Sequence, residues 1–138
     1  MKLSDKTITD NVTEILSSIV EFTQQRREVL SRNIFDYRKD GFRPMDLAVG
    51  EFANRLTGGL AAHLHCKKLI LQDSEHIVFE PEGRFSAVPV IDHGAEDLVR
   101  NDTKTYLKEQ IRKLSENHLH NRVAVELLSQ KRNRQGQF

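Results

Sequence analysis

The chain lacks several features on which secreted, membrane-spanning or catalytic proteins commonly depend. Its single cysteine, Cys66, excludes an internal disulfide framework. No apolar run is long enough to span a bilayer, and the polar start 1–6 is unlike a cleavable secretory signal. The chain also has no Gly-x-Ser-x-Gly elbow, phosphate-binding loop or dinucleotide fingerprint. We therefore expect no enzyme, no cofactor and no membrane insertion.

The net charge and the content of apolar residues are also low. The 138 residues carry a formal net charge of +1, with 38% hydrophobic and 30% charged residues. A near-neutral chain is a poor candidate for dedicated nucleic-acid binding, because that function relies on a strong basic excess. The length indicates one domain, but the apolar content is low for a full core. We therefore expect other copies or other proteins to cover part of the apolar surface.

Two long amphipathic segments stand at the ends of the chain, at about 7–37 and 103–132. In the first, apolar residues recur at steps of three, four and seven, as on one helix face: Val12, Ile15, Ile19, Phe22 and Val29, with a second row at Leu16, Val20, Leu30 and Ile34. In the second, a ladder alternates steps of four and three, as in a coiled-coil seam: Leu107, Ile111, Leu114, His118, Asn121, Val125 and Leu128. A helix of about 30 residues spans roughly 45 Å, which is too long to bury its whole stripe in a domain of this size.

The pattern changes between these segments. Asp40-Gly41 marks a turn, 46–56 fits a short helix ended by Thr57-Gly58-Gly59, and 60–72 fits either helix or strand. The runs 76–80 and 84–91 are typical of two strands around a turn, with Pro89 at an unpaired edge. Such a hairpin is marginal alone, so it is either ordered against neighbours or a mobile arm. We treat 92–97 as a link to the closing helix.

The sequence thus predicts a mainly α fold, in which the N- and C-terminal helices pair as an antiparallel coiled-coil-like hairpin around a small irregular or β-hairpin middle. The predicted segments are 1–37, 38–102 and 103–138, with 7–37 and 103–132 forming one helical domain. The predicted assembly interface consists of apolar residues from both helices: Val12, Ile15, Ile19, Phe22, Leu30, Leu107, Ile111, Leu114, Val125 and Leu128. We expect these residues to pack within and between copies.

The end of the first helix carries a recognisable motif. Arg26-Arg27-Glu28-Val29-Leu30-Ser31-Arg32-Asn33-Ile34 resembles the N-terminal signature of bacterial flagellar basal-body rod proteins, a Ser-x-Asn-Ile-Ala-Asn-x-x-Thr-Pro-Gly-Tyr type motif. The matching positions are Ser31, Asn33, Ile34, Gly41 and Phe42. Phe35 and Asp36 stand where the family usually has Ala and Asn, and Lys39-Asp40 replaces its Thr-Pro. The closing segment 114–129 is similar to the closing helix of the family, and its Val-Glu-Leu-Leu-Ser ending is most similar to the proximal rod subfamily.

The resemblance implies a structural subunit for motility. Members of this family leave the cell through the flagellar type III export apparatus without a cleaved signal, and pack their terminal helices into the rod of the basal body in the periplasm. The implied partners are other copies of the chain, related rod subunits, the membrane-ring protein and the adaptor that joins ring to rod. Nucleic acid is not among them.

Two other functions compete with this interpretation. The first is a small metal-binding protein built on His63, His65 and Cys66, with His76, His93, His118 and His120 as further candidates. Their spacing fits no known zinc pattern, and we expect Cys66 to be a buried thiol because it lies in the apolar run 64–71. The second is a cytoplasmic helical-hairpin adaptor or export chaperone, which would use the same apolar stripe on a different partner.

Overall fold

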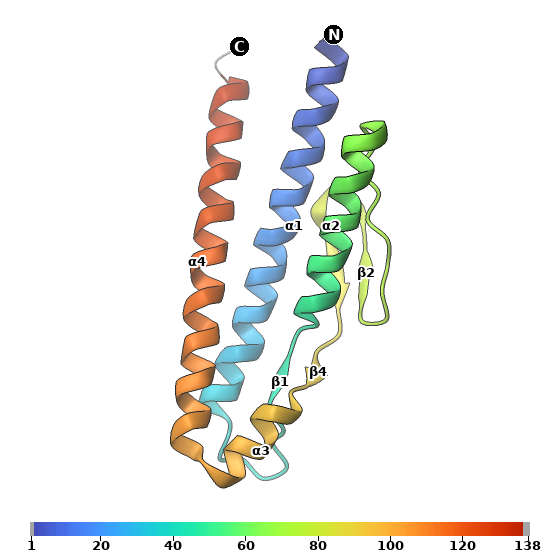
Figure 1. The fold of residues 1–138 in the computed structure, drawn as a ribbon. Helices are drawn as coiled ribbons and strands as arrows, with labels where there is room; N and C mark the ends of the chain where they lie inside the picture. Colours follow the sequence, from blue (N-terminus) through green and yellow to red (C-terminus); the bar gives the residue numbers. More distant parts are fainter. Residues whose placement is uncertain (1, 137–138) are drawn as a thin grey trace.

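The computed structural model describes residues 2–136 as a helical hairpin, with two further helices and two short two-stranded sheets against it (Figure 1). Helix α1 (Lys2–Phe35) and helix α4 (Thr103–Gly136) lie side by side and antiparallel, so that both chain ends lie at the same end of the molecule. The predicted mainly α fold with paired terminal helices is confirmed. Residues 1, 137 and 138, which fall in the predicted terminal segments 1–37 and 103–138, lie outside the described residues.

Helix α1 ends at Phe35, followed by the turn that the sequence predicts around Gly41. The backbone N–H of Asp36 still donates to the carbonyl of Arg32 at 2.8 Å, and Gly41 adopts a positive φ of 76°. Such a φ is readily reached only without a side chain. The chain then enters strand β1 (Met45–Asp46), which pairs antiparallel with strand β4 (Val90–Ile91). This two-stranded sheet joins the start and the end of the middle region.

Helix α2 (Val49–Cys66) is longer than the sequence indicates, and the predicted stop at Thr57-Gly58-Gly59 is wrong. The glycines lie inside the helix. A Cβ added at Gly59 would lie 2.6 Å from Cδ2 of Leu71, because the returning segment 69–71 lies directly against this turn of the helix. Gly59 therefore permits a close approach. The helix ends instead at Cys66, and the following Lys67 caps it with a φ of 55°, the left-handed conformation typical of helix ends.

The predicted β-hairpin is present as strand β2 (Ile77–Phe79) and strand β3 (Phe85–Ala87), joined by the 3-10 turn η1 (Pro81–Gly83). It is not a free arm in this structure. Phe79 and Phe85 pack with Phe22 of α1 and Phe52 of α2, whose rings stack with centroids 4.1 Å apart. A Cβ at Gly83 would lie 2.7 Å from Cβ of Ser17, so the turn also touches α1. Burial of these aromatic rings is the main apolar stabilisation of the middle region.

The predicted second strand, 84–91, is divided at Val88-Pro89, and only its last two residues pair with β1. Proline has no N–H to donate to a sheet, so a strand is readily interrupted there. The expected link 92–97 is wrong, since helix α3 (His93–Asn101) begins in it. The side chain of Asp92 accepts a hydrogen bond from the N–H of Ala95 at 3.0 Å, an N-cap signal that was present in the sequence.

A polar latch holds the loop before β2 on helix α2. Glu51 accepts hydrogen bonds from Nδ1 of His76 at 2.6 Å and from its backbone N–H at 3.0 Å. The adjacent Ser74 side chain and these His76 donors lower the pKa of Glu51 to about 2, and the same carboxylate raises the pKa of His76. The latch is therefore strongest when Glu51 is ionised and His76 is protonated.

Replacing this carboxylate by an amide, Glu51→Gln, should remove a pH-dependent part of the stability. Glu51 stabilises the fold fully above its ordinary pKa of 4.5, and this contribution is lost as the pH falls towards 2. His76 contributes fully below its ordinary pKa of 6.5, and this contribution is lost as the pH rises through its raised value. The wild type should therefore exceed the variant most between these two values.

Urea unfolding of both proteins at about pH 3, 5.5 and 9 measures this difference. Glu75→Gln is the matched control, because Glu75 neighbours the same histidine but lies 3.9 Å from it and is largely exposed. A wild-type advantage over Glu51→Gln that is the same at all three pH values would contradict the latch.

Candidate assembly surface

The contact between α1 and α4 differs in an informative way from the predicted ladder. The α4 residues buried against the rest of the chain are Tyr106, Gln110, Asn117, Ala124 and Leu128. As a description of this contact, the ladder is wrong at Ile111, His118 and Val125, which are exposed. Tyr106, Gln110, Asn117 and Ala124 are buried one position earlier, whereas Leu128 is buried as the ladder predicts. Two of these inner positions, Gln110 and Asn117, are amides, which hydropathy alone does not place in a helix contact.

Asn33 connects three elements at the closed end of the helical hairpin. Its Nδ2 donates to Oε1 of Gln110 at 2.9 Å and to the carbonyl of Met45 at 2.7 Å, while its Oδ1 accepts from the N–H of Met45 at 3.1 Å. Its own carbonyl accepts a 2.6 Å hydrogen bond from the hydroxyl of Tyr106. Asn33 is only 2% exposed, so these bonds satisfy groups that water cannot reach. The motif asparagine therefore fixes how α1, β1 and α4 meet.

The other motif residues have more local positions. Ser31, Ile34 and Phe42 are half-buried, and Gly41 forms the exposed turn described above. The structure thus brings Asn33 into a hydrogen-bonded junction and leaves the remaining matched positions around the end of α1.

A second polar layer lies at the middle of the seam. Nδ2 of Asn117 donates to the carbonyl of Thr23 at 2.8 Å, and Nδ2 of Asn121 donates to the Thr23 hydroxyl at 2.9 Å. The Thr23 hydroxyl in turn donates to the carbonyl of Ile19 at 2.8 Å. Apolar packing on α1 resumes towards the open end, where Leu16 meets Ala124 and Leu128. Buried amides of this kind set the register of paired helices.

Charged residues brace the same seam from the side of the middle region. Arg26 forms a two-fold hydrogen bond with Asp46, at 2.9 Å for each contact. Nζ of Lys113 lies 2.6 Å from Asp92 and 3.7 Å from Asp46. Burial opposes ionisation of Asp92, but hydrogen bonds from Lys113 and from backbone N–H groups outweigh it and lower the pKa. The chain of ions connects α1, the β1–β4 sheet, α3 and α4.

Truncating the central amide, Asn117→Ala, should lower the free energy of unfolding by about 1–3 kcal/mol, since it removes a buried hydrogen bond and leaves a gap. His118→Ala, at the neighbouring position of the predicted ladder, is the control and should cost less than about 0.5 kcal/mol because that side chain is exposed. Denaturant unfolding of both variants measures the difference. A larger cost at His118 than at Asn117 would restore the ladder as the true seam.

An apolar groove lies between α2 and α4 over the middle of α1. It encloses about 890 Å³. Its walls are mainly apolar: Ile19 and Phe22 from α1, Val49, Phe52 and Leu56 from α2, and Leu119, Val123 and Leu127 from α4. The three α4 side chains remain 61%, 51% and 44% exposed, respectively. The chain alone therefore leaves this wall of the groove in water.

The opposite flank of α4 is also apolar and uncovered. Ile111 and Val125 are 53% and 45% exposed, and Val125 borders a second hollow with Val20 and Leu128. Helix α4 thus contacts α1 with one face and presents apolar side chains on both sides of that face. Exposed apolar rows of this kind commonly mark surfaces that a partner covers.

The predicted interface residues divide into three groups. Phe22, Leu30 and Leu128 are buried inside the chain. Five are half-buried, namely Val12, Ile15, Ile19, Leu107 and Leu114, and of these Val12 and Ile19 pack against the buried clusters. Ile111 and Val125 are exposed. The sequence did not point to Leu119, Val123 and Leu127, although their spacing of four is a helical signal.

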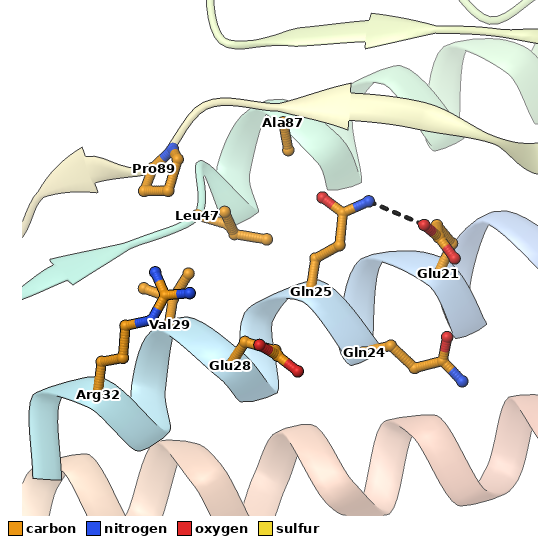
Figure 2. Close-up of a pocket in the computed structure, with 9 residues that line it drawn as sticks. All are labelled: Glu21, Gln24, Gln25, Glu28, Val29, Arg32, Leu47, Ala87 and Pro89. Atoms are coloured by element: carbon orange, nitrogen blue, oxygen red, sulfur yellow. Dashed lines mark hydrogen bonds between the residues drawn. The ribbon is translucent and has the colours of Figure 1, made fainter. Parts of the chain in front are cut away.

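A smaller and more polar trough lies between α1 and the segment that joins β3 to β4 (Figure 2). It encloses about 370 Å³, with Glu21, Glu28 and Arg32 along α1 and Leu47, Ala87 and Pro89 opposite. Nε2 of Gln25 donates to Glu21 at 3.0 Å. The lining residues include no serine, threonine, cysteine, histidine or lysine, and its charged groups are Glu21, Glu28 and Arg32.

The candidate metal ligands do not gather. His63 is buried and its Nδ1 lies 2.9 Å from Nδ2 of Asn11, whereas His65 points to solvent on another face of α2. Cys66 is exposed, so the expected burial of its thiol is wrong, because α2 ends there and nothing covers it. Within the described part of the chain, no three His, Cys, Asp or Glu side chains converge as a possible metal site.

The resemblance to flagellar rod proteins is supported by the motif residues alone, because comparisons with known proteins found no match. No family model, no curated protein and no solved structure matches the chain. No helix within residues 2–136 is both long and apolar enough to cross a membrane.

Proposed function

We propose that this protein is a structural subunit that self-assembles through its terminal helices, as a component of the bacterial flagellar rod and most similar to its proximal subunit. In this function it performs no catalysis. Its partners are other copies, related rod subunits, the membrane-ring protein and the ring–rod adaptor. Export by the flagellar type III apparatus and a periplasmic position in the basal body belong to the same proposal.

One observation carries the proposal: α4 is covered on a single face but has apolar rows on both flanks. Leu119, Val123 and Leu127 form one row, and Ile111 and Val125 belong to the other. Covering two different flanks requires two different neighbouring surfaces, because each flank faces another direction. Contacts between unlike surfaces of identical subunits propagate into rings or helical filaments. This geometry suits a subunit of a tube.

The motif supports the same function from the other helix. Asn33, which the resemblance includes, is the buried junction of α1, β1 and α4. A residue at this junction determines how the two terminal helices are presented to neighbours. Asn33 of the motif sets the geometry of the helical hairpin, and that geometry determines which flanks of α4 are exposed to neighbours.

The variant Ile111→Asp tests the proposal, because it places a charge on an exposed flank where the fold itself has little to lose. We expect unchanged helicity and thermal stability, but about a tenfold or greater loss of self-association, since a desolvated unpaired charge opposes packing. Gln130→Asp is the control, an added charge at an exposed polar position of the same helix. Sedimentation over a wide concentration range measures association.

Motility of a bacterium that depends on this chain provides the second readout. Ile111→Asp should abolish motility and Gln130→Asp should retain it. A wild-type protein that stays monomeric at millimolar concentration, or normal motility of Ile111→Asp, would exclude the rod function and favour a soluble adaptor or chaperone.

A further inference from the structure

Phe35 is the most exposed large apolar side chain among the described residues. It is 81% exposed, although it ends a well-formed helix that carries the core of the chain. It borders a shallow hollow of about 350 Å³ with Arg27, Ser31 and Arg32. Glu28 and Asp36 complete the lining, so the ring stands among charges of both signs. Aromatic and arginine side chains are enriched at the centres of protein interfaces. Solvent exposure of this ring has no structural benefit for the isolated chain.

The groove between α2 and α4 is the matching feature on the other side of the molecule. Phe35 follows Arg26, a groove-lining residue of α1, by nine positions. Nine positions are about two and a half turns of α-helix, so the two side chains leave α1 in opposite directions. The exposed ring and the apolar groove therefore lie on opposite faces of one subunit.

We propose that Phe35 of one copy inserts into the groove between α2 and α4 of the next copy. This inference rests on the proposed function and specifies one contact by which copies join. The groove walls offer Val49, Leu56, Leu119, Val123 and Leu127, which are apolar side chains suited to an aromatic ring. The plug and the groove lie on opposite faces of each copy. A copy whose Phe35 fills a neighbour's groove therefore keeps its own groove free for the next copy, and the contact repeats without closing.

Charge at the rim agrees with parallel copies. Arg32 precedes Phe35 by about one turn, and Glu126 follows Val123 by about one turn. Helices α1 and α4 run antiparallel. In parallel copies, the direction from Phe35 to Arg32 on α1 is therefore the same as the direction from Val123 to Glu126 on α4. Neither Arg32 nor Glu126 forms an ion pair within residues 2–136, so each is available to the other across the contact.

The contact also displaces neighbouring copies along their long axis. Phe35 lies at the closed end of the helical hairpin, whereas the groove lies beside Ile19 and Phe22 of α1. This separation of about 14 residues corresponds to roughly 20 Å at 1.5 Å per residue. A sideways contact with an axial step of this size produces a helical array rather than a flat ring.

Mixing two variants tests the proposal. Phe35→Ala removes the plug but keeps the groove, and Val123→Glu blocks the groove but keeps the plug; both sites are exposed, so folding should be preserved. Each variant alone should associate at least tenfold more weakly than the wild type, because burial of the ring is lost. An equimolar mixture should associate at least tenfold more tightly than either variant alone, because the plug of Val123→Glu then meets the intact groove of Phe35→Ala.

Leu64→Ala is the matched control, an equally exposed apolar residue at the far end of α2 that belongs to neither surface. It should associate as the wild type does. Normal association of Phe35→Ala, or a mixture that associates no more tightly than either variant alone, would overturn the plug and groove. If Phe35→Ala and Val123→Glu associate normally while Ile111→Asp does not, the plug is excluded and the rod function stands. A monomeric wild type would reject both.

Discussion

The rest of the structure depends on the hydrogen-bonded junction at Asn33. This side chain is nearly inaccessible to water, yet it bonds simultaneously to the backbone of β1 and to Gln110 of α4, while its carbonyl is held by Tyr106. A buried amide left without these partners costs about 1–3 kcal/mol, so other registers of the two helices are disfavoured. The junction therefore decides which residues of α4 face α1.

The choice of register has a consequence for the surface. Because Gln110, Asn117 and Ala124 occupy the inner row, the larger apolar residues of α4 are turned outwards to its two flanks. Ile111 and Val125 lie on one flank, and Leu119, Val123 and Leu127 form a wall of the groove. The inner row thus mixes amides with Tyr106, Ala124 and Leu128, while several larger apolar residues of α4 stay in water, which is unusual for an isolated hairpin. They are consistent with helices that also pack against neighbours.

Much of the fold was predictable because it depends on local patterns. The periodicity of both end segments predicted two long helices, and the turn residues predicted the β2–β3 hairpin. Other features required the tertiary structure. Gly59 reads as a helix stop in the sequence, but the close approach of Leu71 explains it as an interior residue of α2. The α1–α4 register was missed because hydropathy assigns amides to the outside, and the hydrogen bonds that bury Asn117 come from residues far away in the chain.

The sequence by itself determined the fold class, the presence of a long helix at each end of the chain and the motif at 26–34, because helix periodicity and turn chemistry act over a few residues. Only the tertiary structure decided which side chains of those helices remain in water. That choice depends on long-range partners: the bonds of Asn33 and Thr23, the ring packing of Phe22 with Phe52, and the position of α2 that creates the groove. Exposure of Phe35 and of the flanks of α4 follows from these distant contacts, and no local pattern contains it.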